Sequence, residues 1–308
     1  MSAYTRRNSR AAAPAGGGYG FTGLTYGRRL LLLACVFVLM MVVAGSAGSL
    51  ASHCFKVGSR DYFIAVSVLQ NLIGFCGTAF VCAIFLSTRP LALLGLNRLG
   101  TSRALLGIVL AFAVGLPFLN QVVWWNSQMH LPAFLGSLES QMRSWEDAAL
   151  TTTNVILGGK SVGALVVNVL VVGVFTGFSE ELCFRGTMQR VIASGGIGGH
   201  AAVWITAVIF SLLHFQFFGF LPRVLLGAFF GYLFLMTGSI YIAATAHALN
   251  NSLYVVVHWL ELRGYSTGNF EHWGVTTHGF PAVACVSLCL LLCVVVGMRG
   301  YLFSTKKV

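Results

Sequence analysis

Apolar residues along the chain gather into long runs that short polar connections separate. The runs lie at about 30–50, 62–86, 104–120, 160–193, 199–218, 222–237, 240–260 and 280–298. A run of about 20 apolar residues is long enough to cross the hydrocarbon core of a membrane as a helix. The pattern therefore predicts an all-α polytopic membrane protein with about eight transmembrane helices.

The longest connection, between the third and fourth runs, has a different pattern. Its apolar residues recur at helical spacing, opposite a charged face. The apolar positions are Leu131, Phe134, Leu135, Leu138, Met142, Trp145 and Ala149, and the charged ones are Glu139, Arg143, Glu146 and Asp147. This predicts one amphipathic helix on the membrane surface, either as a packed structural element or as a gate for substrate.

The two ends of the chain are basic. Residues 1–29 contain five arginines and no acid around a stretch rich in Gly, Ala and Ser, so we expect a disordered tail there. We expect a single membrane domain at 30–300 with its catalytic core at 160–258, and a basic C-terminal tail at 301–308. The first apolar run is longer than the apolar core of a cleavable signal peptide, which has roughly 7–15 residues, and this favours a membrane span.

Composition supports membrane insertion and excludes a soluble domain. The chain is 57% hydrophobic and 9% charged, with a mean hydropathy of +0.82. Its net charge of +11 comes from Lys and Arg clusters between the apolar runs, which are topology signals and not a nucleic-acid surface. Counted by connection, 13 of these residues fall on the side of the termini and six on the other, which predicts cytoplasmic termini. The expected partner is the lipid bilayer, and the short loops suggest a bacterial cytoplasmic membrane.

Two of only eight acidic residues, Glu180 and Glu181, stand side by side within the fourth apolar run. A charged residue at the bilayer centre costs roughly 2.5–3.5 kcal/mol on insertion scales, so such residues indicate a functional site. Glu181 precedes Arg185 by four residues, the favourable order for an ion pair on a helix. We therefore expect Arg185 to neutralise one carboxylate and to leave Glu180 available.

Two later helices supply polar residues at the same depth. His214 shares a helix face with Phe210, and His247 shares one with Asn251. Glu180 and His214 each lie 17 residues from Ile197, in the glycine-rich turn that joins their helices. Equal separation from the turn of an antiparallel hairpin means equal depth, so we expect these groups to meet in one cavity.

A carboxylate, two imidazoles and an amide at one depth suit peptide hydrolysis inside a membrane. Glu180 and His214 would hold a water molecule and remove its proton. His247 and Asn251 would donate hydrogen bonds to the oxyanion of the tetrahedral intermediate, a task commonly worth about a hundred- to thousandfold per donor.

Three motifs occur in order at these residues. They are EExxxR at Glu180–Arg185, continuing as Phe184-Arg185-Gly186, FxxxH at Phe210–His214, and HxxxN at His247–Asn251. Together they resemble those of the CAAX protease and bacteriocin-processing (Abi) family of intramembrane glutamic endopeptidases. The resemblance implies an eight-helix fold, a metal-free site and a peptide or protein substrate in the membrane. It also implies that Glu180 and His214 activate the water and that His247 and Asn251 form the oxyanion site.

The sequence leaves other interpretations open. Glu180, Glu181, His214 and His247 could instead bind zinc. Cys183 could be a thiol nucleophile, although the eight cysteines contain no zinc spacing and are expected to pack as small apolar residues. The protein could also be a non-proteolytic scaffold, or a transporter that uses the same buried charges as a proton relay.

The side on which the site opens receives two conflicting predictions. His214 lies close to the Gly219–Pro222 turn, which the charge count puts outside the cell. The resemblance to CAAX proteases implies instead a site that opens to the cytosol.

Overall fold

The computed structural model describes residues 20–304, and the N-terminal segment 1–19 and residues 305–308 lie outside that description. The first half of the described chain forms α1 (Tyr26–Leu50), α2 (Arg60–Leu69), the π-helical η2 (Gln70–Gly77), α3 (Thr78–Leu86), α4 (Pro90–Leu94), α5 (Ser102–Ser127) and α6 (Gly136–Leu157). The second half forms α7 (Val162–Asn168), π-helical η4 (Val169–Phe175), α8 (Thr176–Glu181), π-helical η5 (Leu182–Gln189), α9 (Arg190–Ala193), α10 (Gly199–Leu212), α11 (Phe220–Thr237), α12 (Ile240–Leu262) and α13 (Ala282–Ser304). Short 3₁₀ turns η1 (Ala51–His53), η3 (Ala133–Leu135), η6 (Phe217–Gly219) and η7 (Phe270–His272) complete it.

The predicted all-α membrane architecture is confirmed. Between residues 20 and 304 there is no β-strand, only an isolated bridge between Phe21 and Ser87. Seven helical segments in this part are long and apolar enough to span a membrane. The eighth, α10, has 14 residues and is about 21 Å long at a rise of roughly 1.5 Å per residue, shorter than a membrane core. The protein is thus an integral membrane protein with seven long spans and one short apolar helix.

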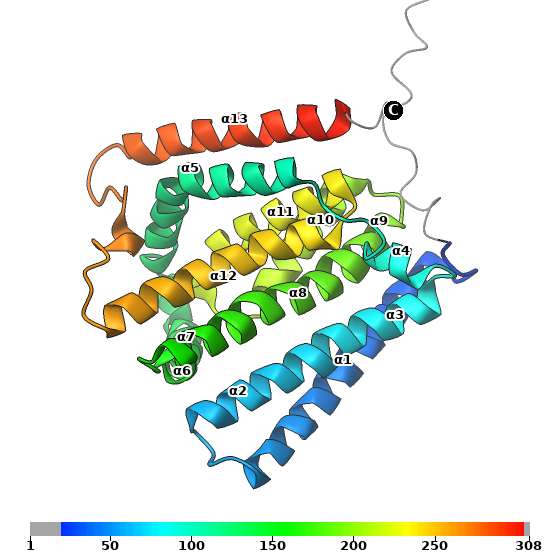
Figure 1. Cartoon of the computed structure of the whole chain (residues 1–308), viewed down its shortest axis with the longest axis horizontal. Helices are drawn as coiled ribbons and strands as arrows, with labels where there is room; N and C mark the ends of the chain where they lie inside the picture. The colour runs from blue at the N-terminus through cyan, green and yellow to red at the C-terminus, as the bar shows by residue number, and fades with distance from the viewer. Residues whose placement is uncertain (1–19, 305–308) are drawn as a thin grey trace, which may run out of the picture.

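The helices are arranged around the segment that carries the paired glutamates. Figure 1 shows α5 and α13 side by side along one edge and α1 with α2 and α3 along the opposite edge. Between them, α8 lies next to α12, and α10 packs against α11. The central helical segment runs without a break from α7 to α9, residues 162–193. Helices from both halves of the chain pack around it.

Several helix boundaries differ from the expected ones. The helix α1 begins at Tyr26, so the last residues assigned to the N-terminal tail are helical. Residues 20–25 of that tail are described and are not helical, whereas residues 1–19 lie outside the described residues. At the other end α13 continues to Ser304, into the segment 301–308 that was expected to be a tail. Arginine and tyrosine are good enough helix formers to extend an apolar helix beyond the membrane core.

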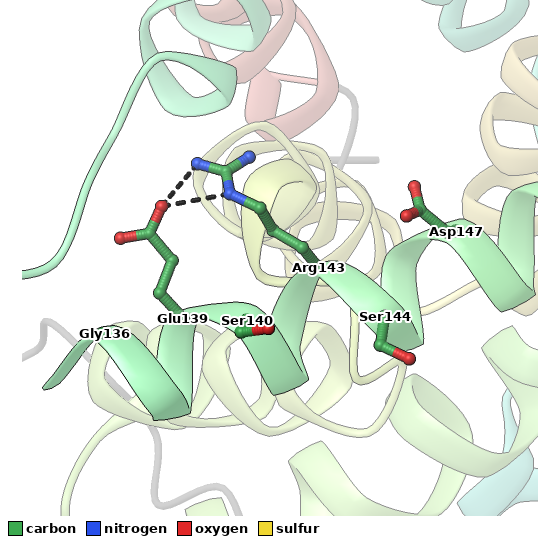
Figure 2. Close-up of a pocket in the computed structure, with 6 residues that line it drawn as sticks. All are labelled: Gly136, Glu139, Ser140, Arg143, Ser144 and Asp147. Atoms are coloured by element: carbon green, nitrogen blue, oxygen red, sulfur yellow. Dashed lines mark hydrogen bonds and ion pairs between the residues drawn. The ribbon is translucent and has the colours of Figure 1, made fainter.

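The helix α6 carries the later part of the predicted amphipathic pattern, from Leu138 onward, and continues to Leu157. The first predicted apolar positions lie before it, since Leu131 is not helical and Phe134 and Leu135 belong to η3. Glu139 fixes its start because one carboxylate receives Leu131 N at 2.8 Å, Arg143 Nη2 at 2.6 Å and His130 Nδ1 at 2.9 Å. Figure 2 shows this ion pair beside Ser140, Ser144 and Asp147, along a surface pocket of about 560 Å³. The polar face of α6 is therefore tied locally to the segment that precedes the helix.

This arrangement gives a pH dependence to the start of α6. The backbone N–H of Leu131, followed by Arg143 and His130, lowers the pKa of Glu139 to about 2. A lowered carboxylate pKa stabilises the fold fully above the ordinary value of about 4.3 and loses that stabilisation as the pH falls toward 2. We expect amide exchange of residues 129–143, corrected for intrinsic rates, to be constant from pH 7 to 5 and to rise below about pH 4.

A variant pair separates Glu139 from acidity in general. Glu139→Ala is expected to raise exchange in this segment already at pH 7 and to abolish its acid dependence. Asp147→Ala, about two turns further along α6, serves as the control and should leave both unchanged. Equal protection of residues 129–143 in Glu139→Ala and the native protein would contradict the role given to Glu139.

Candidate active site

Glu181 and Arg185 form a fully buried ion pair, as their spacing predicts. Arg185 Nη1 lies 2.7 Å from Glu181 Oε1, and both side chains are 0% exposed. The other terminal nitrogen of Arg185 donates to the carbonyl of Gly227 on α11 at 2.8 Å. The guanidinium also lies over the Phe210 ring, 4.8 Å from its centroid. Arg185 thus joins the central helix to α10 and α11 and compensates one buried carboxylate.

His247 links the two glutamates from α12. Its Nδ1 lies 2.9 Å from Glu181 Oε1, and its Nε2 lies 3.7 Å from Glu180 Oε2. The imidazole stacks on the ring of Phe230 with centroids 4.8 Å apart. Because a carboxylate oxygen accepts, the short contact to Glu181 puts a proton on Nδ1. Glu181 therefore fixes His247 so that its other nitrogen points toward Glu180.

Two glycines let α12 approach the central helix closely enough for this contact. A Cβ at Gly177 would lie 2.9 Å from the backbone nitrogen of Ala248, the neighbour of His247. One at Gly173 would lie 2.3 Å from Ser252 Oγ. These glycines are four residues apart and share a helix face, the small-residue pattern that allows close packing of membrane helices.

His214 lies in the turn after α10, which corrects the prediction that the helix extends to residue 218. The helix ends at Leu212 because the chain turns back at Phe215, which has a positive φ of 53°. His214 nevertheless keeps its predicted relation to Phe210, since its Nδ1 lies 2.7 Å from that residue's carbonyl oxygen. A carbonyl only accepts, so Nδ1 carries the proton and Nε2 is left as an acceptor.

Glu180 and His214 line one cavity of about 380 Å³. The rest of its wall comes from η2 and its flank, from the end of α6 and from the central helix. These residues are Ser67, Gln70, Asn71, Phe75, Thr153, Ile156, Leu157, Val172 and Thr176. Glu180 itself is only 7% exposed. Cys183, the alternative nucleophile, is fully buried and is not part of this wall.

Asn251 lies behind the cavity wall. Its Nδ2 donates to the carbonyl of Val172 at 3.2 Å, and Val172 lines the cavity. Val172 belongs to the π-helical η4, and single π-helical turns inside α-helices occur frequently at functional sites. The structure thus places Asn251 next to the site, with its amide engaged by the backbone.

A buried polar network beside Glu180 was not anticipated from the sequence. Ser179 Oγ donates to Asn71 Oδ1 at 2.6 Å, and Asn71 Nδ2 donates to Thr176 Oγ1 at 3.0 Å. Thr176 Oγ1 in turn donates to the carbonyl of Val171 at 2.9 Å. Asn71 therefore connects the second apolar run to the turn of helix that presents Glu180. A polar amide within an apolar run was the signal that could have revealed it.

The remaining motif residues pack around the site. Phe184 contacts the ring of Phe210 at a centroid distance of 5.0 Å, and Phe210 lies 4.8 Å from the His214 ring. At Gly186 a Cβ would lie 3.2 Å from the carbonyl of Leu94, so this glycine allows α4 to pack closely. These three positions shape the site through packing.

The side chains around Glu180 do not form the ligand set of a zinc site. Across residues 20–304, no three His, Cys, Asp or Glu side chains come together as a group that could hold a metal ion. Glu181 is also committed to Arg185 and His247. We therefore derive no step through a metal.

Comparison with known proteins gives one match. Residues 162–253 match the model of a protein family described as type II CAAX prenyl endopeptidase Rce1-like. No curated protein and no solved structure gives a significant match. The matched segment runs from the start of α7 to the middle of α12 and so contains all three motifs and the residues around Glu180. The part of the chain that carries the site is therefore similar to the Rce1-like family of type II CAAX prenyl endopeptidases.

Proposed function

We propose that the protein is a glutamic-type intramembrane endopeptidase that hydrolyses a peptide bond of a membrane-associated substrate. The observation that carries the proposal is that Glu180 and His214 line the same cavity while His247 contacts both carboxylates. The match to a CAAX endopeptidase family supports peptide hydrolysis as the reaction class.

In the proposed mechanism Glu180 and His214 activate a water molecule. The water donates a hydrogen bond to His214 Nε2, which the bond from Nδ1 to Phe210 leaves free to accept, and it keeps that proton. Glu180 takes the other proton of the water as the water oxygen attacks the scissile carbonyl, and later delivers this proton to the leaving amine. A general base at this position commonly contributes about 10²–10⁴-fold.

His247 is proposed to stabilise the oxyanion from Nε2. This role requires a proton on both of its nitrogens, since Nδ1 is bonded to Glu181. Asn251 is proposed as the second donor, and for this its Nδ2 must share or exchange its bond to the Val172 carbonyl. The reaction is proposed to need no metal.

The proposed substrate class is a lipidated or leader-bearing peptide in the membrane, and the proposed location is a bacterial cytoplasmic membrane. The family description makes an S-prenylated cysteine the first feature to test. We expect the native protein in proteoliposomes to cleave a fluorescence-quenched peptide that ends in S-farnesylcysteine followed by three residues. The same peptide without the farnesyl group should be cleaved at least about tenfold more slowly, because its anchoring in the bilayer is lost.

The controls separate the parts of this proposal. A chelator such as 1,10-phenanthroline should leave the rate unchanged, and loss of activity that zinc restores would contradict a metal-free site. Equal cleavage of the two peptides would contradict recognition of the lipid. Absence of cleavage of both by the native protein would contradict a CAAX-type substrate.

A further inference from the structure

The turn that carries His214 has an unusual backbone. Phe215, its neighbour, has a φ of 53°, a conformation that bulky side chains rarely adopt. Such a conformation costs free energy and persists where surrounding contacts fix it. The contacts of residues 213–219 therefore determine where the His214 imidazole points.

The amphipathic helix α6 supplies several of these contacts from three neighbouring positions. The Trp145 ring lies 6.0 Å from the ring of Phe215 and 6.2 Å from that of Phe217. Glu146 Oε2 accepts from the backbone nitrogen of Phe218 at 3.2 Å. The guanidinium of Arg143 lies 4.0 Å from the centroid of the Phe218 ring. One helix thus holds the turn by both aromatic packing and a backbone hydrogen bond.

The other end of α6 is part of the cavity wall. Thr153, Ile156 and Leu157 line the cavity with Glu180 and His214. Arg60 Nε donates to the Ile156 carbonyl at 2.9 Å, which ties this end to α2. About 15 Å of helix separates Glu146 from Ile156 at a rise of roughly 1.5 Å per residue. A single rigid element therefore spans from the wall of the cavity to the turn that bears the imidazole.

We propose that Trp145 and Glu146 are positioning residues that hold the 213–219 turn so that His214 faces Glu180 across the cavity. The proposal rests on the proposed function for its catalytic consequence, and on the contacts of α6 for its structural one. It predicts a loss of turnover without a loss of substrate binding, because neither side chain lines the cavity.

The kinetic test uses the farnesylated peptide in proteoliposomes. We expect Trp145→Ala to lower kcat about tenfold with KM within twofold of the native value, since a displacement of about 1 Å can cost up to about a hundredfold. Trp145→Phe should retain most of the activity because it keeps an aromatic contact. Glu146→Gln should keep the hydrogen bond and the activity, whereas Glu146→Ala should lose both. Trp125→Ala is the matched control, since Trp125 is 46% exposed and Trp145 is 42% exposed.

Hydrogen–deuterium exchange of the full protein tests the positioning without reference to activity. Trp145→Ala should speed exchange in residues 213–219 at least severalfold, while Trp125→Ala should not. Unchanged exchange, or faster exchange with an unchanged kcat, would overturn the proposal. If the native protein cleaves neither peptide but Trp145→Ala still speeds exchange in residues 213–219, the proposed function is refuted and the structural role of α6 stands. A rise in exchange throughout Trp145→Ala would point to general unfolding and would likewise overturn it.

Discussion

Replacing Glu180 with Gln is expected to reduce peptide hydrolysis by about a thousandfold or more. The change keeps the size of the side chain but removes the group that accepts the proton of the attacking water, whose contribution is about 10²–10⁴-fold. Glu180 is buried beside His247 and Glu181, so a base from the solvent cannot replace it. The measurement is the initial rate of cleavage of the farnesylated peptide at equal amounts of folded protein.

The matched control is Glu271→Gln, since Glu271 is exposed in η7 and lies outside the cavity wall. It should keep the native rate. The thermal midpoint of Glu180→Gln should lie at or above the native value, because the neutral amide costs less to bury than a charged carboxylate. A Glu180→Gln protein with half the native rate would contradict the role of Glu180 as the base.

Replacing Arg185 with Leu is expected to have the largest effect on stability. The substitution leaves Glu181 without its cation at a site that is 0% exposed, and breaking a buried pair typically costs about 3–5 kcal/mol. It also removes the bond to the Gly227 carbonyl. We expect a fall in the thermal midpoint of roughly 6–20 °C, since the shift is about 2–4 °C per kcal/mol for domains of about 150–250 residues. The midpoint would be measured in detergent at fixed lipid content.

A double variant separates stability from catalysis here. Glu181→Leu combined with Arg185→Leu leaves no unpaired charge, so it should recover a large part of the lost stability. It should remain inactive because His247 has lost the carboxylate that holds its Nδ1. A midpoint in the double variant as low as in Arg185→Leu alone would show that the pair does not act through charge compensation.

The apolar pattern was enough to predict most of the fold. Runs of about 20 apolar residues have few alternatives in a membrane, because only helices satisfy their own backbone groups there. The same argument located Glu180 and Glu181, since paired acids in such a run are costly. The i, i+4 spacing of Glu181 and Arg185 predicted an ion pair, and equal distance from the turn at Ile197 predicted the shared depth of Glu180 and His214.

Other features depended on contacts between distant segments and were not predictable from local pattern. The end of α10 at Leu212 follows from the backbone at Phe215, which an apolar run does not reveal. The contact of Glu181 with His247 arises from close packing at Gly173 and Gly177. Helical periodicity gave α6 an apolar and a polar face, but it could not indicate that Trp145 reaches the turn of His214.

The proposal that Glu180 makes this protein a protease is tested most directly without choosing a substrate. Membranes of cells that carry either the native protein or Glu180→Gln, matched for protein level, would be profiled for new peptide termini by mass spectrometry. Peptide termini that occur with the native protein and disappear in Glu180→Gln are the predicted result, and they identify the substrate. The same termini in both membranes, across several growth conditions, would contradict proteolysis by this site.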